Sequence, residues 1–470
     1  MQSRSDETIA PASSFSPPSQ AGYTGYRASR GRGSVGDSPQ LPVEIRNYLD
    51  GALSRLIAVV SPDRTRVDRS GVRFFRAPGR VNLIGDHTDY NGGLVLPMAI
   101  DLAVFLACLP SRNVFLISRR EPDLVALAPD GSQAVSNYSL PEWGRYVQGV
   151  LVELTERGRP PKGFYGAIAS QIPPGRGLSS SAALEVAVAT AALALAELSL
   201  SPWELAEACR SAEQRYAGVA CGIMDQAISI MGKAGHALLI DTARKSAEQI
   251  PMPELFDIVA IDSGVRRSLA EAAYNARRQE CASALQMLNK DGRIGKIDTL
   301  SDITEEHLNE ATKPLPAILA KRVRHVVTEN VRVRKVSEIL RELYSLYRES
   351  PDPKSARVLQ SRVDSCLAKL RELLEDSHTS LVTQYDAGHP TTNFLVEQAA
   401  HEPGYIGARQ TGAGWGGSVV IFAKKGTGAD LARSLIQQIT RNPQTRNIAG
   451  PDATAPSFHV CKSSQGASEL

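Results

Sequence analysis

The chain has 470 residues, more than one compact core usually holds, so about two or three domains are expected. Apolar residues make up 42% of the chain and charged residues 22%, as in ordinary globular proteins. The formal net charge of +3 is small for this length and gives no support to a surface that binds nucleic acid.

The six cysteines are scattered, and no two of them form a C-x-x-C pair. This pattern argues against a zinc site or a disulfide framework and suits a reducing compartment. The most apolar run, residues 181–200, is interrupted by Glu185 and Glu197, so it is not expected to span a membrane. A soluble, cytoplasmic protein is therefore expected, with no membrane or nucleic-acid partner.

Residues 1 to about 40 are rich in Ser, Gly, Pro and Arg, and this composition predicts a disordered tail. Periodicity in the first half then predicts elements in chain order. These are a helix at 43–57, a strand at 72–85 broken at Pro78-Gly79, a pair of strands within 94–109, short strands at 113–120 and 123–129, a helix at 146–158, a strand at 163–170 and a long buried helix at 180–198.

The second half continues with the same mixture of helices and strands. The patterns predict a strand at 256–263, a helix at 268–288, mainly helical chain at 317–376 with a break at 350–355, a glycine-rich turn at 412–417 and a strand at 418–425. We expect an α+β fold with two domains, at residues 41–249 and 250–470, although the boundary could fall anywhere between 230 and 260.

The clearest chemical signal is the sequence IPPGRGLSSSAALEVA, residues 172–187, where a Pro/Gly turn leads through serines into an apolar helix. Glycines let backbone N–H groups approach an anion, and the helix N-terminus adds its dipole. A helix cap would need only one serine, so Gly175, Gly177 and three serines together favour a phosphate loop. It is not a Walker A loop, because no Lys follows the glycines.

Three further segments carry polar or flexible residues. Residues 85–93, GDHTDYNGG, contain Asp86, His87 and Asp89, which suit a ligand with many hydroxyl groups or a solvated turn. Glu213 and Asp225 flank a run of small residues; such acids are usually surface charges, but phosphoryl transfer needs carboxylates at the metal and at the attacking hydroxyl. The third segment, residues 407–417, is glycine-rich.

The segments APGRVNLIGDHTDYNGGLVLP, PPGRGLSSSAALEVA and GARQTGAGWGGSVV occur in the order and spacing of the three motifs of the GHMP small-molecule kinases. The first resembles the galactokinase signature, and the similarity covers roughly residues 45–425. The resemblance implies the two-domain GHMP kinase fold with its active site between the domains. It also implies phosphorylation of the anomeric hydroxyl of galactose, with ATP and Mg²⁺. We expect the enzyme to be a monomer.

Site residues follow from the resemblance position by position. Arg80 matches the arginine beside the reacting hydroxyl, Asp225 the carboxylate in the catalytic-base position, and Ser180 and Glu213 the magnesium ligands. The residues that match sugar contacts are Asp86, His87, Asp89, Gly222 and Tyr274, and those that match the phosphate loop are Gly175, Gly177, Ser179, Ser180 and Ser181. Residues 141–150 match a Trp-Tyr segment on the nucleotide side, and Arg266 matches a basic residue near the phosphate.

Some positions depart from the family pattern and leave alternatives open. Asp86 stands where galactokinases commonly carry Glu, which bears on the choice of sugar. In the third motif the departures are Gln410, Ala413, Trp415 and Ser418. The alternatives are a kinase for another galactose-like sugar, such as N-acetylgalactosamine, and a non-catalytic galactose and ATP sensor. Thr88 and Asn91 favour galactose, and the intact serine run favours an enzyme.

Overall fold

A computed structural model describes residues 40–61, 70–121, 123–133, 139–265, 270–348, 356–442 and 453–470. The predicted disordered tail, the break at 350–355 and Arg266 lie outside this part of the chain, apart from residue 40. Within it, no helix is both long and apolar enough to cross a membrane. None of the six cysteines forms a disulfide.

The first sheet has eight strands with the path β12-β1-β2-β5-β3-β4, and β6 and β7 extend it from β2. Its strands are β1 (Arg73–Ile84), β2 (Leu94–Pro110), β3 (Val114–Ser118), β4 (Val125–Leu127), β5 (Phe164–Ser170), β6 (His236–Asp241), β7 (Ser246–Pro251) and β12 (Ser468–Glu469). Pairing is antiparallel except between β3 and β5.

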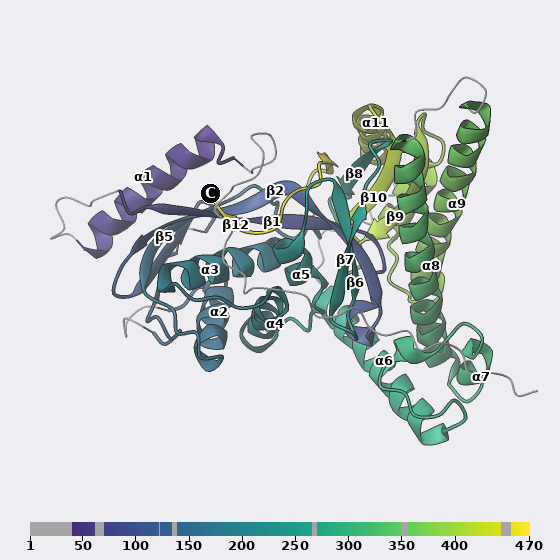
Figure 1. Ribbon diagram of the computed structural model, residues 1–470, viewed down its shortest axis with the longest axis horizontal. Helices are drawn as coiled ribbons and strands as arrows, with labels where there is room; N and C mark the ends of the chain where they lie inside the picture. The colour runs from purple at the N-terminus through teal and green to yellow at the C-terminus, as the bar shows by residue number, and fades with distance from the viewer. Residues whose placement is uncertain are drawn as a thin grey trace, which may run out of the picture.

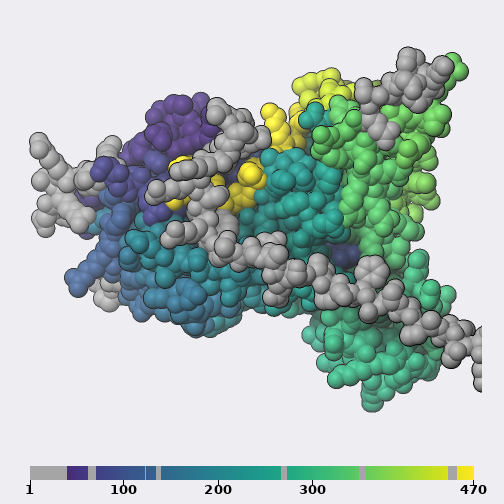
Figure 2. All heavy atoms as spheres, viewed as in Figure 1, coloured from purple at the N-terminus to yellow at the C-terminus, as the bar shows by residue number. Residues whose placement is uncertain are grey.

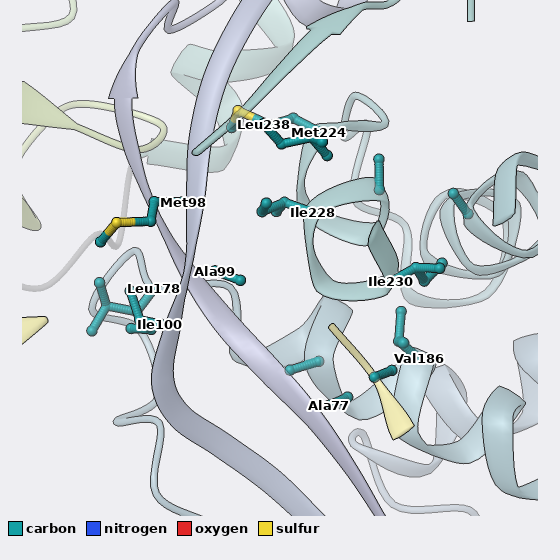
Figure 3. Packing of buried hydrophobic residues seen from close by; sticks show 14 of the residues in the cluster. Ala77, Met98, Ala99, Ile100, Leu178, Val186, Met224, Ile228, Ile230 and Leu238 are labelled. Atoms are coloured by element: carbon teal, nitrogen blue, oxygen red, sulfur yellow. The ribbon is translucent and has the colours of Figure 1, made fainter. Parts of the chain in front are cut away.

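Helices cover both faces of this sheet (Figure 1). Helix α1 (Val43–Val60) packs on one face, against alternate side chains of β2 and β5. The other face carries α2 (Gly144–Glu156), α3 (Ser180–Ala196), α4 (Pro202–Ala212) and α5 (Met224–Met231). Successive strand residues point to opposite faces. In Figure 3, Ala99 accordingly points toward Ile228 of α5, whereas Ile100 lies on the other side near Leu178.

The second sheet has four antiparallel strands in the order β11-β8-β10-β9. These are β8 (Phe256–Asp262), β9 (Tyr405–Thr411), β10 (Ser418–Lys424) and β11 (Ser457–Cys461). One face packs on α10 (Pro390–Ala399) and α11 (Gly428–Arg441), and the other faces the long helices α8 (Ala317–Arg348) and α9 (Ala356–Thr383). A third group, α6 (Ala270–Asp291), α7 (Leu308–Thr312) and the start of α8, has its own small core. Figure 2 shows α6 and α7 as a projecting lobe.

The two sheets are not separated by solvent, because one hydrophobic cluster includes residues of both. Val81 and Leu96 of the first sheet, Val420 and Phe422 of the second, and Val336 of α8 belong to it. The chain also returns at its end: β11 pairs with β8 in the second sheet, and β12 pairs with β1 in the first. The proposed division at residue 250 therefore assigns all of the last residues to the second domain, although β12 belongs to the first sheet.

Most elements lie where the sequence predicts them. Two predictions about strands are wrong in detail: β1 continues through Pro78-Gly79 with only a register shift, and residues 94–110 form one long strand instead of a pair. Both strands are buried along almost their whole length. The pairing of β1 with β2 therefore continues beyond the register shift at Pro78.

Candidate active site

A cavity of about 460 Å³ lies where the loops of the first sheet meet those of the second. Apart from Arg266, which lies outside the described residues, and the segment 141–150, the residues predicted to bind substrate, phosphate or metal, or to act in catalysis, line this cavity. They are Arg80, Asp86, His87, Asp89, Gly175, Gly177, Ser179, Ser180, Ser181, Glu213, Gly222, Asp225 and Tyr274. Segments far apart in the chain therefore meet at one site, as the motif order predicts.

Arg80 and Asp225 form a two-pronged ion pair at the wall of the cavity. Arg80 Nε lies 2.8 Å from Asp225 Oδ1, and Nη2 lies 2.7 Å from Oδ2. Arg80 belongs to β1, and Asp225 lies in the first turn of α5. The Ser179 hydroxyl donates a third hydrogen bond to Asp225 Oδ2. Three donor groups from two residues thus set the direction of this carboxylate, which is the geometry required of a group that orients a substrate hydroxyl.

In the predicted phosphate loop, residues 174–181, three consecutive carbonyl groups accept hydrogen bonds from other elements. The Arg176 carbonyl accepts from Ser418 Oγ at 2.6 Å, that of Gly177 accepts from Arg80 Nη1, and that of Leu178 accepts from the Arg80 N–H at 3.2 Å. A glycine-rich turn before a helix N-terminus can present N–H groups to an anion, which is the role expected of this loop.

Gly79 lets β1 approach this loop closely. A Cβ atom at that position would lie 2.6 Å from the Leu178 carbonyl oxygen and 2.9 Å from the Ile172 side chain. The glycine in the family's first motif is thus explained by contact with the second motif, because any side chain there would push the loop away from Arg80.

The polar loop, residues 85–93, is folded by its own hydrogen bonds. Thr88 Oγ1 donates to the Gly85 carbonyl at 2.8 Å, and Asn91 Nδ2 donates to the His87 carbonyl at 2.8 Å. His87 has a φ angle of 65° and Gly85 one of 102°, so the backbone bends sharply around Asp86. Thr88 and Asn91 thereby shape the loop, and His87 and Asp89 are presented to the cavity.

Burial changes the proton affinity of both presented side chains. Burial, together with the nearby Asp225, raises the pKa of Asp89 to about 6, against hydrogen bonds from the Tyr90 and Met224 backbone that lower it. Burial lowers the pKa of His87 to about 3, with His325 acting in the same direction. At neutral pH the imidazole is therefore uncharged, and its Nδ1 shares a hydrogen bond of 2.8 Å with the Tyr90 hydroxyl.

Asp86 lines the cavity, but protein donors occupy its carboxylate. Oδ1 accepts from Asn82 at 2.8 Å and from the Gly412 N–H at 3.2 Å, while Oδ2 pairs with Arg409 at 2.5 Å. Arg409, on β9, is fully buried and also lies 3.7 Å from Glu329 of α8. The sequence analysis missed Arg409, because nothing in the sequence distinguishes a buried arginine from an exposed one.

Glu213 is a buried carboxylate whose partners are uncharged. It begins the short π-helical turn Glu213–Ala217 after α4, and Gln226 Nε2 donates to it at 2.7 Å. Burial raises the pKa of Glu213, opposed by hydrogen bonds from the Ser181 and Cys221 side chains. No Lys, Arg or His among the described residues forms an ion pair with it. A buried acid without a counter-charge, beside serine hydroxyls, has the donor chemistry that suits Mg²⁺.

A second cavity, of about 580 Å³, shares Ser180 and Ser181 with the first. Trp143 and Tyr146, from the segment predicted to lie on the nucleotide side, line it together with Ile172. Further lining residues of the first cavity that the sequence analysis did not single out are Val219, Met224 and Asn275. They carry no motif of their own and are identified only by their position.

The comparisons with known proteins agree with this geometry. Residues 64–110 match the galactokinase galactose-binding signature, residues 145–233 the GHMP kinases N terminal domain, and residues 334–439 the GHMP kinases C terminal family. A galactokinase of Chloroflexus aurantiacus is 40% identical over 352 residues, which is 74% of this chain and 83% of that protein. A galactokinase of Roseiflexus is 37% identical over 83% of this chain and 91% of that protein.

Solved structures give the same result. The Lactococcus lactis galactokinase complexed with galactose aligns with a TM-score of 0.74 and 29% identity, over 89% of this chain and 99% of that one. The mevalonate kinase of Methanococcus jannaschii, at 15% identity and a TM-score of 0.53 over 84% of this chain and 99% of that one, shares the fold. The chain therefore belongs to the galactokinase family of the GHMP kinases.

Proposed function

We propose that this enzyme transfers the γ-phosphoryl group of ATP to the anomeric hydroxyl of galactose, at the cavity described above. The observation that carries the proposal is the Arg80–Asp225 pair, which lies between a loop built for phosphate and a loop built for hydroxyl groups. The galactokinase of Lactococcus lactis was solved with galactose bound, which supports galactose as the sugar here.

In the proposed reaction, Asp225 accepts a hydrogen bond from the anomeric hydroxyl and directs its oxygen toward the γ-phosphorus. The new O–P bond forms as the bond to the leaving ADP oxygen breaks, and the hydroxyl proton passes to the Asp225 carboxylate. Arg80 holds that carboxylate in place and offsets negative charge at the phosphoryl group. Because the carboxylate is already positioned by three donors, little reorganisation is needed when the substrates meet.

Each substrate has a proposed set of contacts. Asp89, His87, Gly222 and Tyr274 contact the sugar hydroxyls, and the N–H groups of residues 175–181 hold the phosphates. The adenine ring occupies the second cavity beside Trp143. Ser180 and Glu213 hold Mg²⁺, which when bound neutralises phosphate charge. Ser179 has a different role from that of its neighbours, since its hydroxyl donates to Asp225.

We also propose that the enzyme is a cytoplasmic monomer of two domains. The cavity is lined by residues of one chain and is complete without a second copy. Light scattering on the purified protein tests the monomer, with a mass of about twice 50.6 kDa as the contrary result.

The test of function is sugar-dependent ADP release with Mg-ATP, measured across galactose, galactosamine, N-acetylgalactosamine, 2-deoxygalactose, glucose, galacturonate and arabinose. We expect the highest kcat/KM with galactose. A preference for N-acetylgalactosamine would assign the enzyme to another sugar of the same shape. Sugar binding without ADP release from any of the sugars would contradict catalysis and indicate a sensor.

A further inference from the structure

One residue of the phosphate loop is held entirely by the second sheet. Arg176 Nε lies 3.0 Å from Asp262 Oδ2, its Nη1 donates to Ser457 Oγ, and its carbonyl accepts from Ser418 Oγ at 2.6 Å. Asp262 ends β8, Ser418 begins β10 and Ser457 begins β11, so three different strands supply the contacts.

These three residues form one row across the sheet. In the antiparallel register, Ser418 is paired with Asp262 on one side, and Ser457 is paired with Asp262 on the other. Directly opposite residues lie close enough for their side chains to meet at one partner. The row therefore presents a hydroxyl donor, a carboxylate and a hydroxyl acceptor to a single arginine. We call Arg176 and this row the Arg176 anchor.

The anchor fixes the loop from the side opposite to Arg80. Arg80 of the first sheet binds the carbonyl groups of Gly177 and Leu178, and Ser418 of the second sheet binds that of Arg176. Three consecutive carbonyls of the loop are thereby held by hydrogen bonds to the two sheets. Asp262 and Ser418 are buried, so these contacts are shielded from water and are stronger than a surface pair.

Arg176 itself is not among the residues that line the cavity, although its neighbours Gly175 and Gly177 are. Its side chain extends toward Asp262 and Ser457 of the second sheet. We therefore assign it a role that acts through the backbone of the loop.

We propose that Arg176 is a positioning residue for the nucleotide. Through its contacts with Asp262, Ser418 and Ser457, the second sheet holds the phosphate loop in shape, and this shape determines the affinity for ATP. The inference rests on the proposed use of this loop for ATP. Ser418 departs from the family pattern, and the proposal explains it, because its hydroxyl donates to the Arg176 carbonyl in the loop.

The test is direct binding of a fluorescent ATP analogue with Mg²⁺, together with KM for ATP and for galactose. The variants are Arg176→Met, Arg176→Lys, Asp262→Asn, Ser457→Ala and the double variant of Arg176→Met with Asp262→Asn. Arg341→Met is the matched control, because Arg341 pairs with Glu248 at 2.7 Å and lines neither cavity.

We expect Arg176→Met and Asp262→Asn each to weaken ATP-analogue binding by about tenfold, which corresponds to about 1.4 kcal/mol. The double variant should be no weaker than the worse single variant, because both changes remove the same contact. Arg176→Lys keeps the charge and should restore part of the affinity, and Ser457→Ala should cause a smaller loss. KM for galactose should change little, whereas Arg176→Met should lower the Tm, because it leaves the buried Asp262 carboxylate without this partner.

Additive losses in the double variant, unchanged analogue binding in Arg176→Met, or equal increases in both KM values would overturn the proposal. The binding measurement needs no turnover, so it separates this proposal from the proposed function. A wild-type protein that binds the ATP analogue but phosphorylates no sugar would contradict the function alone. Failure of the wild-type protein to bind the analogue would contradict both.

Discussion

The contacts of Asp225 indicate that this residue contributes to kcat much more than to substrate binding. Asp225→Asn keeps the size of the side chain but removes the charge that pairs with Arg80 and the capacity to take a proton. We expect kcat to fall by about 100- to 10,000-fold, with a much smaller change in KM for either substrate. Steady-state kinetics test this expectation. Asp241→Asn, at the partly exposed pair with Arg244, is the control that should retain activity.

Asp89 should make sugar binding depend on pH. Its pKa of about 6, raised by burial from 3.8, means that the carboxylate becomes protonated as pH falls through 6. A protonated carboxyl is a weaker acceptor for sugar hydroxyls, so KM for galactose should rise below pH 6. The measurement is KM for galactose between pH 5 and 8, at pH values where the Tm shows that the enzyme stays folded.

The effect of Asp89 on stability has the opposite direction. A raised pKa means that the folded protein binds this proton more tightly than the unfolded chain does. The contribution of Asp89 to the free energy of unfolding should therefore decrease as pH rises from 3.8 to about 6. Asp89→Asn should remove that dependence, and it should also raise KM for galactose at neutral pH. An unchanged KM profile in the variant would contradict the assignment.

Gly222 is required by the position of Asp89. A Cβ atom at Gly222 would lie 1.7 Å from Asp89 Oδ2, so Gly222→Ala must displace the carboxylate. We expect KM for galactose to rise by at least about tenfold, while affinity for ATP stays near that of the wild type. Gly51→Ala in α1 is the matched control, since its added methyl group would have only an ordinary contact at 3.5 Å. Equal effects of the two changes would contradict the prediction.

At the level of single residues, the sequence predicts which side chains meet but not what each one does. The glycines, serines and acids assigned to the site by the resemblance all line one cavity. Asp86 was expected to bind substrate, yet its partner Arg409 lies far away in the chain and could not be found by pattern. Buried ion pairs between distant segments leave no periodic signal, so structure is needed to detect them.

Among the elements, α4 has a clear local signal for its N-terminus. Ser201 caps its N-terminus by accepting from the Glu204 N–H, and Glu204 accepts in return from the Ser201 N–H at 2.8 Å. Ser201→Ala should lower the free energy of unfolding by about 1 kcal/mol, measured by urea denaturation. Ser201→Asp should restore most of it. Ser345→Ala, at an exposed position inside α8, should cause no loss, and a comparable loss there would rule out the capping explanation.

Elements were predicted well where hydrophobic periodicity is strong and poorly where pairing partners are distant. Helix α3 is apolar on all faces and was expected to be buried, as it is. The hairpin of β6 and β7 was not predicted, and the other elements that were not predicted are α4, α5, α7, α10, α11, β9, β11 and β12. Strand β12 has only two residues. It is a strand only because it pairs with the edge of β1, and no local sequence pattern reveals that pairing.

For the molecule as a whole, Arg409 is a point where the polar loop, α8 and the second sheet meet. It is fully buried between Asp86 and Glu329. Arg409→Met leaves two buried carboxylates without this partner, and we expect the free energy of unfolding to fall by about 3–5 kcal/mol. Arg362→Met, at an exposed pair with Glu342, should cost less than about 1 kcal/mol. Thermal and chemical denaturation measure both.

The same network should make the protein sensitive to acid. Although burial raises the pKa of Glu329, Arg332 and Arg409 lower it to about 2. Because this folded-state pKa lies below the ordinary value of 4.5, the stabilisation is fully present above pH 4.5 and is lost as pH falls toward 2. Glu329→Gln should therefore be less stable than the wild type at neutral pH, and the difference in Tm should shrink in acid. A difference that is constant with pH would contradict this account.

The closing strand β12 has a consequence for how the protein is made. Glu469 pairs with Arg73 across 396 positions, so the outer edge of β1 has no partner while the intervening chain is synthesised. At ribosomal rates this interval lasts roughly 20 to 80 seconds. An open strand edge can pair with other chains during that time. Slower translation lengthens the time for which this edge of the newly made first half stays open.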